Sequence, residues 1–222
     1  RILYVAEGFR KGLNLDNIHQ LCKIDPWFLN QIKEIVDTES EINKKPFEKD
    51  VFKLIKSMGF SDQKISELSK KSLDQIEEFK KDNDIKIAYK KVDTCAAEFS
   101  SLTPYMYSTY DHGLMSDGEC EANPSNTEKV IIIGGGPNRI GQGIEFDYCC
   151  CQASFSLKEM GFETVMINCN PETVSTDYDT SDRLYFEPLI DEYIIEILKK
   201  ESSNGKIKGV IVQFGGQTPI KL

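Results

Sequence analysis

The sequence predicts an α/β protein in which an all-helical part precedes a doubly wound, mostly parallel sheet. Up to residue 83, apolar residues recur at the spacing of short amphipathic helices. From residue 128 onward, apolar strand-like runs alternate with helical patterns, which is the order of parallel βαβ units. The expected organisation is therefore a helical domain over 1–83, a connecting segment over 84–127 and an α/β domain over 128–222.

Local capping signals support the helices of the first part. Asp25 followed by Pro26 predicts a helix start, because aspartate caps well and proline fits the first turn. Another amphipathic helix is expected over 46–58, ended by the glycine that follows it. Ser61 is placed to cap the next helix, and 72–75 match the capping box S/T-x-x-E/Q. Nothing in this part points to catalysis, so it is interpreted as a packing module.

The connecting segment gives a weaker signal. Ile85, Ile87 and Tyr89 alternate like a strand, and residues 105–110 also look extended. Residues 111–125 are rich in Asp, Gly, Asn, Pro and Ser, which indicates a loop.

The last part alternates strands and helices. The strands are expected over 129–133, 164–168, 183–186 and 209–214, and the helices over 145–160 and 191–200. Ligands of parallel sheets bind beyond the carboxyl ends of the strands. The informative segments are therefore 134–143, 168–177 and 213–219.

Charge and composition exclude several classes of protein. The net charge of −9 lies entirely in 84–222, since 1–83 contain 15 basic and 15 acidic side chains. Neither part has the basic surface that binds nucleic acid, and no apolar run approaches the ~18 residues of a membrane span. The first residues also lack the apolar core of a signal peptide. We expect a soluble protein without a nucleic-acid or membrane partner.

The seven cysteines are odd in number, and three are consecutive at 149–151. Adjacent residues on a helix point in different directions, so these thiols are not spaced as metal ligands. The sequence therefore predicts reduced thiols in a reducing compartment and no metal site.

A glycine-rich loop over 134–143 follows the first strand of the α/β part. It fails G-x-G-x-x-G, because the sixth position is Arg139, and it fails the phosphate-loop pattern, because Gln142 stands where lysine is required. Asn168 occupies the position at which a dinucleotide site has an acid. A nicotinamide-dependent dehydrogenase is therefore disfavoured.

Two interpretations of this loop remain equally compatible with the pattern. Its backbone N–H groups and the following helix N-terminus could hold an anion, or its glycines only allow close helix–sheet packing. Glu145 and Asp147 fall in the first helical turn, where acids interact favourably with the helix dipole, so they need no catalytic role. Arg139 is expected to bind a ligand, and no residue is predicted to be catalytic.

Several segments together resemble one family, the large chain of carbamoyl-phosphate synthase. They occur in the family's order over nearly the whole chain. The sequence departs from the family's pattern mainly between Tyr110 and Cys120. The matching segments are Ile24-Asp25-Pro26-Trp27-Phe28-Leu29, 91–99 (KVDTCAAEF), 105–110 (YMYSTY), 120–124 (CEANP), 134–148, 168–177 (NCNPETVSTD) and 213–219 (QFGGQTP).

The resemblance implies a helical oligomerisation domain followed by a Rossmann-like pre-ATP-grasp subdomain of the second, carbamoyl-phosphate-forming half. It also implies that the chain is a fragment that stops before the ATP-grasp domain and is inactive alone. The parent enzyme is expected to make carbamoyl phosphate from bicarbonate and glutamine-derived ammonia, for pyrimidine or arginine biosynthesis. ATP and Mg²⁺ or Mn²⁺ are expected mainly in the ATP-grasp domains. The expected partners are a separate or fused glutaminase and a second copy, in the cytoplasm or in mitochondria.

The resemblance further implies that loop residues of the chain line the carbamate site or the path leading to it: Gly134, Gly135, Gly136, Arg139, Gln142, Gly143, Asn170 and Gln217. An alternative of another class is that the chain serves only self-association and binds no ligand at 134–143.

Overall fold

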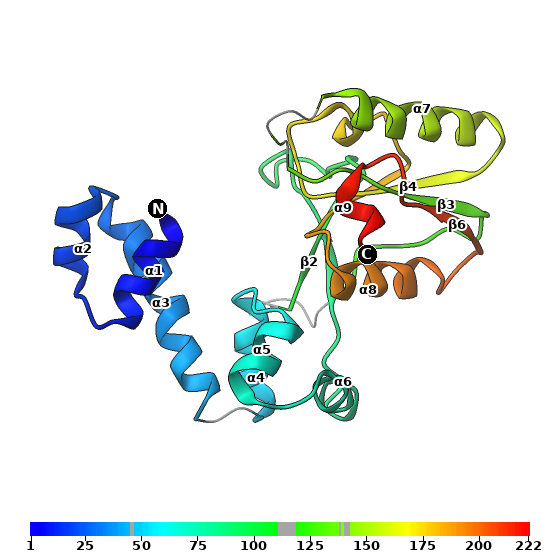
Figure 1. The fold of residues 1–222 in the computed structure, drawn as a ribbon. Helices are drawn as coiled ribbons and strands as arrows, with labels where there is room; N and C mark the ends of the chain where they lie inside the picture. Colours follow the sequence, from blue (N-terminus) through cyan, green and yellow to red (C-terminus); the bar gives the residue numbers. More distant parts are fainter. Residues whose placement is uncertain (45–46, 111–118, 138, 140–142) are drawn as a thin grey trace. The chain divides into compact units, whose positions relative to one another are not determined.

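The computed structural model describes residues 1–44, 47–110, 119–137, 139 and 143–222. The chain forms two compact units, Arg1–Lys86 and Ile87–Leu222. The first is helical and the second is α/β, as the sequence predicts (Figure 1). None of the helices in the described ranges has the length and apolar character needed to cross a bilayer.

The first unit contains α1 (Ile2–Arg10), α2 (Leu15–Cys22), α3 (Pro26–Ile42), α4 (Lys49–Ser57), α5 (Asp62–Ser69) and α6 (Leu73–Asp82). Three predicted caps are confirmed. The Asp25 carboxylate accepts from the Trp27 N–H at 2.8 Å, Ser61 accepts from the Lys64 N–H, and the capping box at the start of α6 is complete. The helix expected over 46–58 instead begins at Lys49.

Two apolar clusters stabilise this unit. Val5, Phe9, Ile18, Leu29 and Val36 join α1, α2 and α3. Around α4–α6, three aromatic rings pack together, with Phe47 centred 5.8 Å from Phe52 and 5.0 Å from Phe79. Phe47 therefore contributes to packing from outside α4, and the extended backbone of Glu48 (φ −95°, ψ 139°) places the helix start at Lys49.

The second unit contains one six-stranded sheet in the order β1-β2-β5-β4-β3-β6. Its strands are β1 (Ala88–Lys91), β2 (Tyr105–Thr109), β3 (Lys129–Ile133), β4 (Glu163–Asn168), β5 (Arg183–Phe186) and β6 (Ile207–Ile211). Only the β1–β2 pair is antiparallel, and all other neighbours are parallel. The expected mostly parallel sheet is therefore confirmed.

Two strands begin two or more residues away from their predicted starts. The fourth expected strand, 209–214, lies at 207–211 because it pairs with β3 from Lys129↔Ile207 to Ile132↔Ile211. The alternation over 85–89 becomes a strand only from Ala88, where pairing with Thr109 begins. In both cases the partner strand sets the limits.

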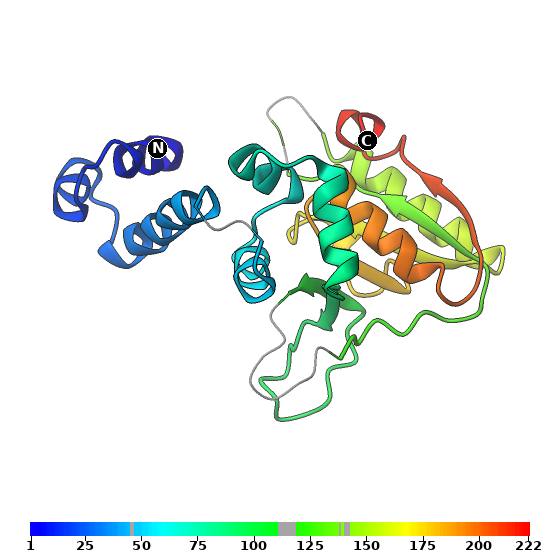
Figure 2. The same cartoon turned by 90° about the horizontal axis from the view of Figure 1, so that it is seen from below.

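Helices cover both faces of the sheet (Figures 1 and 2). On one face, α7 (Glu145–Glu159) contributes Cys150 to a cluster with Ile132 and Met166 of the sheet. On the other, α8 (Asp191–Glu201) contributes Ile197 to a cluster with Ile131 and further side chains of the sheet. Adjacent residues of β3 thus enter opposite cores, which explains why residues 130–133 of this strand are all apolar.

A buried ionic network closes the end of the sheet at which β3, β4 and β5 begin. The fully buried Lys129 ammonium lies 3.1 Å from the Glu201 carboxylate, and Arg183 binds both Glu201 and Glu163. The Tyr185 hydroxyl also donates to Glu201. This network therefore lies at the end of the strands opposite their carboxyl ends.

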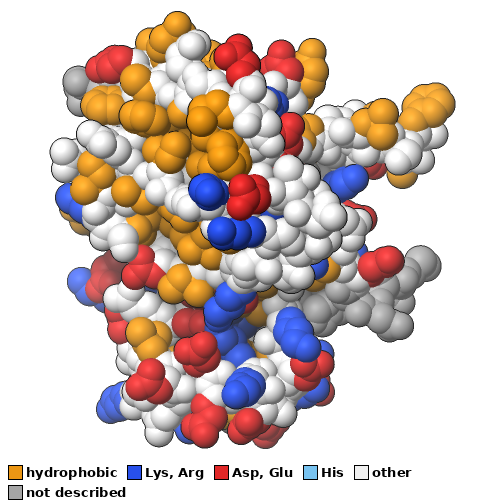
Figure 3. Space-filling view, turned by 90° about the vertical axis from the view of Figure 1, so that its right-hand side faces the viewer, with side chains coloured by type: hydrophobic (Ala, Val, Ile, Leu, Met, Phe, Trp, Pro, Cys, Tyr) orange, Lys and Arg blue, Asp and Glu red, His pale blue; other side chains and the backbone are white. Residues whose placement is uncertain are grey.

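The outer edge of β6 is partly apolar. Val210, Val212 and Phe214 are each between a third and two fifths exposed. Figure 3 shows hydrophobic side chains gathered on the side of the second unit that carries this edge. The short α9 (Gln217–Ile220) follows β6.

Candidate functional site at the carboxyl ends of the strands

Two loops meet where β3 and β4 end, and Asn168 joins them. Asn168 is the last residue of β4 and is fully buried. Its Oδ1 accepts from the N–H groups of Gly136, at 3.1 Å, and of Asn170, at 3.3 Å. Its Nδ2 donates to the Ser175 hydroxyl at 3.2 Å. An amide that accepts and donates is needed here, which explains why an asparagine stands at the position where dinucleotide sites have an acid.

The glycines of the loop are required for close packing. A Cβ on Gly134 would lie 2.5 Å from the Asn168 Nδ2, and one on Gly135 would lie 3.0 Å from the Gly215 carbonyl oxygen. Gly136 has a φ of +74°, a left-handed conformation that favours glycine. Glycine at these positions therefore permits the close approach of Asn168 and Gly215 and the left-handed backbone of Gly136.

Two of the loop's backbone N–H groups already have acceptors within the protein. The Gly134 N–H donates to the Ile167 carbonyl oxygen at 2.8 Å, and the Gly136 N–H donates to Asn168. Both donors are therefore used within the protein. The physical reason is that buried backbone donors are satisfied by the fold itself wherever an acceptor is in reach.

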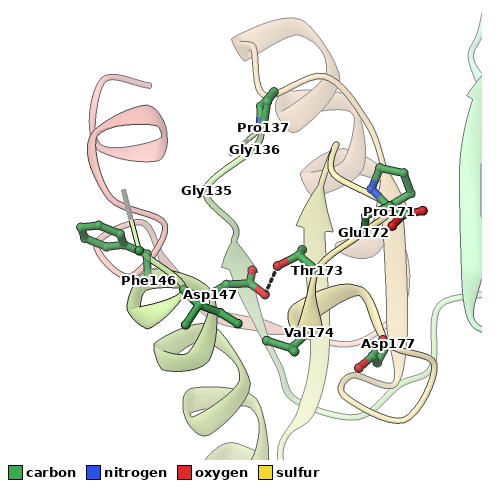
Figure 4. Close-up of a pocket in the computed structure, with 12 residues that line it drawn as sticks. Gly135, Gly136, Pro137, Phe146, Asp147, Pro171, Glu172, Thr173, Val174 and Asp177 are labelled. Carbon is green, nitrogen blue, oxygen red and sulfur yellow. Dashed lines mark hydrogen bonds between the residues drawn. The ribbon is translucent and has the colours of Figure 1, made fainter. Parts of the chain in front are cut away.

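Asp147, in the first turn of α7, contacts the loop that follows β4. Its Oδ2 accepts from the Thr173 hydroxyl and, at 2.7 Å, from the Ser175 N–H. Ser175 lies in a short 3₁₀ helix, Val174–Thr176. Figure 4 shows the Asp147 carboxylate directed toward Thr173. The helix dipole alone accounts for an acid at this position, but the structure shows that Asp147 also fixes this loop to α7.

A cavity of about 620 Å³ lies between these elements (Figure 4). Its described walls come from the glycine loop, the start of α7 and the loop after β4: Gly135, Gly136, Pro137, Gly143, Ile144, Phe146, Asp147, Pro171, Glu172, Thr173, Val174 and Asp177. Three of them are carboxylic acids, and none of the described lining residues is a lysine, arginine or histidine. These walls by themselves favour a neutral or cationic occupant over a free anion.

The candidate residues are divided between the cavity and its surroundings. Gly135, Gly136 and Gly143 line it. Gly134 packs against Asn168, as described above. Gln142 lies outside the described residues. The other three candidates lie elsewhere.

Arg139, Asn170 and Gln217 are not among the described lining residues of the cavity. The exposed Arg139 donates to the Thr218 hydroxyl at 3.0 Å, which links the glycine loop to α9. Asn170 is half-buried, and its Oδ1 accepts from the Glu172 N–H at 3.0 Å, which shapes the loop after β4. Gln217 is exposed at the start of α9.

One buried acid near this end of the sheet was not singled out by any motif. Glu187 follows β5 directly and is 3% exposed. Its carboxylate accepts from the Ser108 N–H and, at 2.9 Å, from the Ser108 hydroxyl, which ties β2 to the end of β5. Burial raises the pKa of Glu187 to about 7. Its position directly after a predicted strand was the only available signal.

Two of the three consecutive cysteines, Cys150 and Cys151, are buried, whereas Cys149 is exposed. Burial raises the pKa of the Cys150 thiol to about 12 and that of the Cys151 thiol to about 11, so both remain protonated at neutral pH. Across the described residues, no cluster of three or more His, Cys, Asp or Glu side chains is arranged to hold a metal ion.

Comparison with protein families identifies both units. Residues 1–84 match the model of the carbamoyl-phosphate synthetase large chain, oligomerisation domain. Residues 126–222 match that of the carbamoyl phosphate synthase preATP-grasp domain.

Curated relatives align with the whole chain. The carbamoyl phosphate synthase large chain of Rhizobium meliloti is 54% identical over all of this chain and 19% of its own length. That of Vibrio vulnificus is 55% identical over all of this chain and 20% of its own length. The chain thus spans about a fifth of the length of the relatives it matches. It belongs to the family of carbamoyl phosphate synthase large chains, within which it corresponds to the oligomerisation domain and the preATP-grasp domain.

Proposed function

We propose that this chain acts within a glutamine-hydrolysing carbamoyl-phosphate synthase. The parent reaction is the ATP-dependent synthesis of carbamoyl phosphate from bicarbonate and glutamine-derived ammonia. Its product serves pyrimidine or arginine biosynthesis. The observation that carries this proposal is the alignment of the entire chain with large chains at 54–55% identity.

In this proposal the second unit supplies one wall of the carbamate-phosphorylating site or of the path that leads to it. The cavity supports this role because it lies beyond the carboxyl ends of parallel strands, where such sheets bind ligands. Gly135, Gly136 and Gly143 form part of its wall. Gln142 and Arg139 are proposed to act from the same loop, and Asn170 and Gln217 to supply neutral hydrogen bonds.

The described cavity walls are acidic, so they do not themselves stabilise a transferring phosphoryl group. Phosphoryl transfer depends on cations and positioning groups around the phosphates. We assign these groups, together with ATP and Mg²⁺ or Mn²⁺, to ATP-grasp domains of the parent enzyme. The isolated chain is accordingly proposed to be inactive.

The first unit is proposed to mediate self-association, and a glutaminase subunit or fused domain is the proposed source of ammonia. The name of the matching domain supports the first of these proposals. The cytoplasm is the proposed location.

The test uses the full-length protein that contains this chain. It is incubated with ATP, magnesium, bicarbonate and ammonia, and carbamoyl phosphate is trapped as citrulline by ornithine and its transcarbamoylase. ATP-dependent citrulline supports the proposal. Its absence from a folded, ATP-binding protein would refute it and favour a purely self-associating role.

Arg139→Ala in the same protein tests the site. If Arg139 contacts a reacting anion, citrulline formation falls, whereas Thr218→Val, which removes only the hydroxyl bonded to Arg139, leaves most of the activity. Unchanged kinetics of Arg139→Ala would remove this residue from the site.

A further inference from the structure

Helix α7 has an apolar face beyond the one that packs on the sheet. Ile144, Tyr148, Cys151 and Phe155 follow one another at the spacing i, i+4, i+7 and i+11, which places them in one stripe along about three turns. Ile144 is 67% exposed, Tyr148 58% and Phe155 42%. The sheet core uses different residues of this helix, including Cys150. Apart from Cys151, which is buried, the stripe is therefore apolar surface that the fold of this unit leaves uncovered.

The stripe forms the floor of a groove of about 540 Å³. The opposite wall is the segment after β4, which contributes Val174 and Thr180. A hollow between a helix and a neighbouring loop offers an apolar side chain contact on more than one side, unlike a scattered surface residue. Contiguous apolar surface of this kind marks interaction sites.

The rim of the groove is acidic. Glu145, Asp177 and Asp179 line it and are exposed, and no lysine, arginine or histidine is among its described lining residues. The nearby Lys158 is already paired, 3.5 Å from Asp182. The uncompensated charge therefore selects a partner with positive side chains beside its apolar ones.

We propose that this groove binds an amphipathic helix with an apolar stripe flanked by lysine or arginine. A three-turn apolar floor matches the i, i+3/i+4, i+7 anchors by which helices dock into grooves. The carboxylates at the rim are placed to pair with basic residues on either side of that stripe.

The groove adjoins the cavity described above. Ile144, Val174 and Asp177 line both, and Figure 4 shows Val174 and Asp177 on the loop that Asp147 ties to α7. A helix seated in the groove therefore braces the outer side of the cavity wall. This inference concerns a partner surface and does not depend on the reaction proposed for the parent enzyme.

The experiment uses the whole chain and a defined probe. The probe is a fluorescein-labelled helical peptide of about 15 residues, with leucines at the i, i+4, i+7 and i+11 spacing and flanking lysines. A matched peptide has glutamates in place of the lysines. Fluorescence anisotropy at low and moderate salt measures both affinities. The lysine peptide is expected to bind at least about tenfold more tightly than the glutamate peptide, with an affinity that falls as salt rises.

Two variants locate the binding. Phe155→Glu is expected to weaken binding of the lysine peptide at least about tenfold, because it removes an apolar anchor from the floor of the groove. Asp177→Asn combined with Asp179→Asn, which leaves the apolar floor intact, should remove most of the preference for lysine. The control is Phe99→Glu, the same substitution at an exposed phenylalanine of the same unit outside the groove. Circular dichroism verifies that each variant is folded.

Equal binding of the two peptides, no binding of either, or binding that Phe155→Glu leaves unchanged would overturn the proposal. Sedimentation equilibrium without peptide provides a further test. If the chain self-associates and Phe155→Glu abolishes that association, the groove is occupied by a second copy, and the proposal of a basic helix is wrong.

Discussion

Glu187 offers a quantitative test of the electrostatics at the carboxyl end of the sheet. Its buried carboxylate accepts two hydrogen bonds from Ser108, yet burial raises its pKa from 4.5 to about 7. When a carboxyl group whose pKa is raised by folding becomes ionised, it destabilises the folded state. The cost appears as the pH rises above 4.5, grows until about pH 7 and is constant above that.

The magnitude follows from the shift. At 1.36 kcal/mol for each pKa unit, a rise from 4.5 to about 7 corresponds to about 3 kcal/mol at pH 8. Glu187→Gln removes the charge and keeps both contacts, because its amide oxygen accepts from the Ser108 N–H and its amide nitrogen donates to the Ser108 hydroxyl. The variant should therefore be more stable than the wild type by up to about 3 kcal/mol near pH 8, and nearly equal to it near pH 4.5.

The assay is hydrogen exchange of the β4 and β5 amides at several urea concentrations, which reports the free energy of unfolding of the second unit alone. Wild type and variant are compared at each pH, so the intrinsic pH dependence of exchange cancels. Glu159→Gln, at an exposed site on α7, is the matched control and should show little change. If Glu187→Gln gives the same difference at acidic and alkaline pH, or destabilises the unit at pH 8, the burial argument is refuted.

Three further predictions concern stability. Glu201→Ala should destabilise the second unit by about 3–5 kcal/mol in urea titrations, because it removes the nearest carboxylate from the fully buried Lys129 and one of the two carboxylates paired with Arg183. The more exposed pair is the control: Glu196→Ala should cost less than about 1 kcal/mol, and a small effect at both positions would contradict this. Gly134→Ala should lower the midpoint of thermal unfolding, because its Cβ would overlap the buried Asn168 side chain. Gly209→Ala, with open space around the added Cβ, should leave the midpoint unchanged. Equal midpoints for the two variants would show that the loop relaxes freely. Ser72→Ala should lower the free energy of unfolding of the first unit by about 0.5–2 kcal/mol, because it removes the helix cap. Fluorescence of the single tryptophan measures the unfolding. An unchanged free energy would mean that the capping box is dispensable.

The sequence by itself determined those features that depend on neighbouring residues. The caps at Asp25 and Ser72 act on N–H groups two or three positions away, so their motifs predicted helix starts correctly. Residues 130–133 are apolar throughout because both faces of this strand are buried, and the limits of the strand, 129–133, were predicted without error. The ordered motifs along the chain also identified the family, which the comparisons confirmed.

Only the tertiary structure decided the features that depend on distant residues. The limits of β6 follow from its pairing with β3, and the use of the Gly136 N–H follows from Asn168, which is 32 positions away. The pKa of Glu187 is raised because other elements exclude water from it. The sequence specifies which chemical groups each residue carries. Burial and hydrogen-bond partners arise only when remote segments come together, and burial and these partners determine the electrostatics of the site.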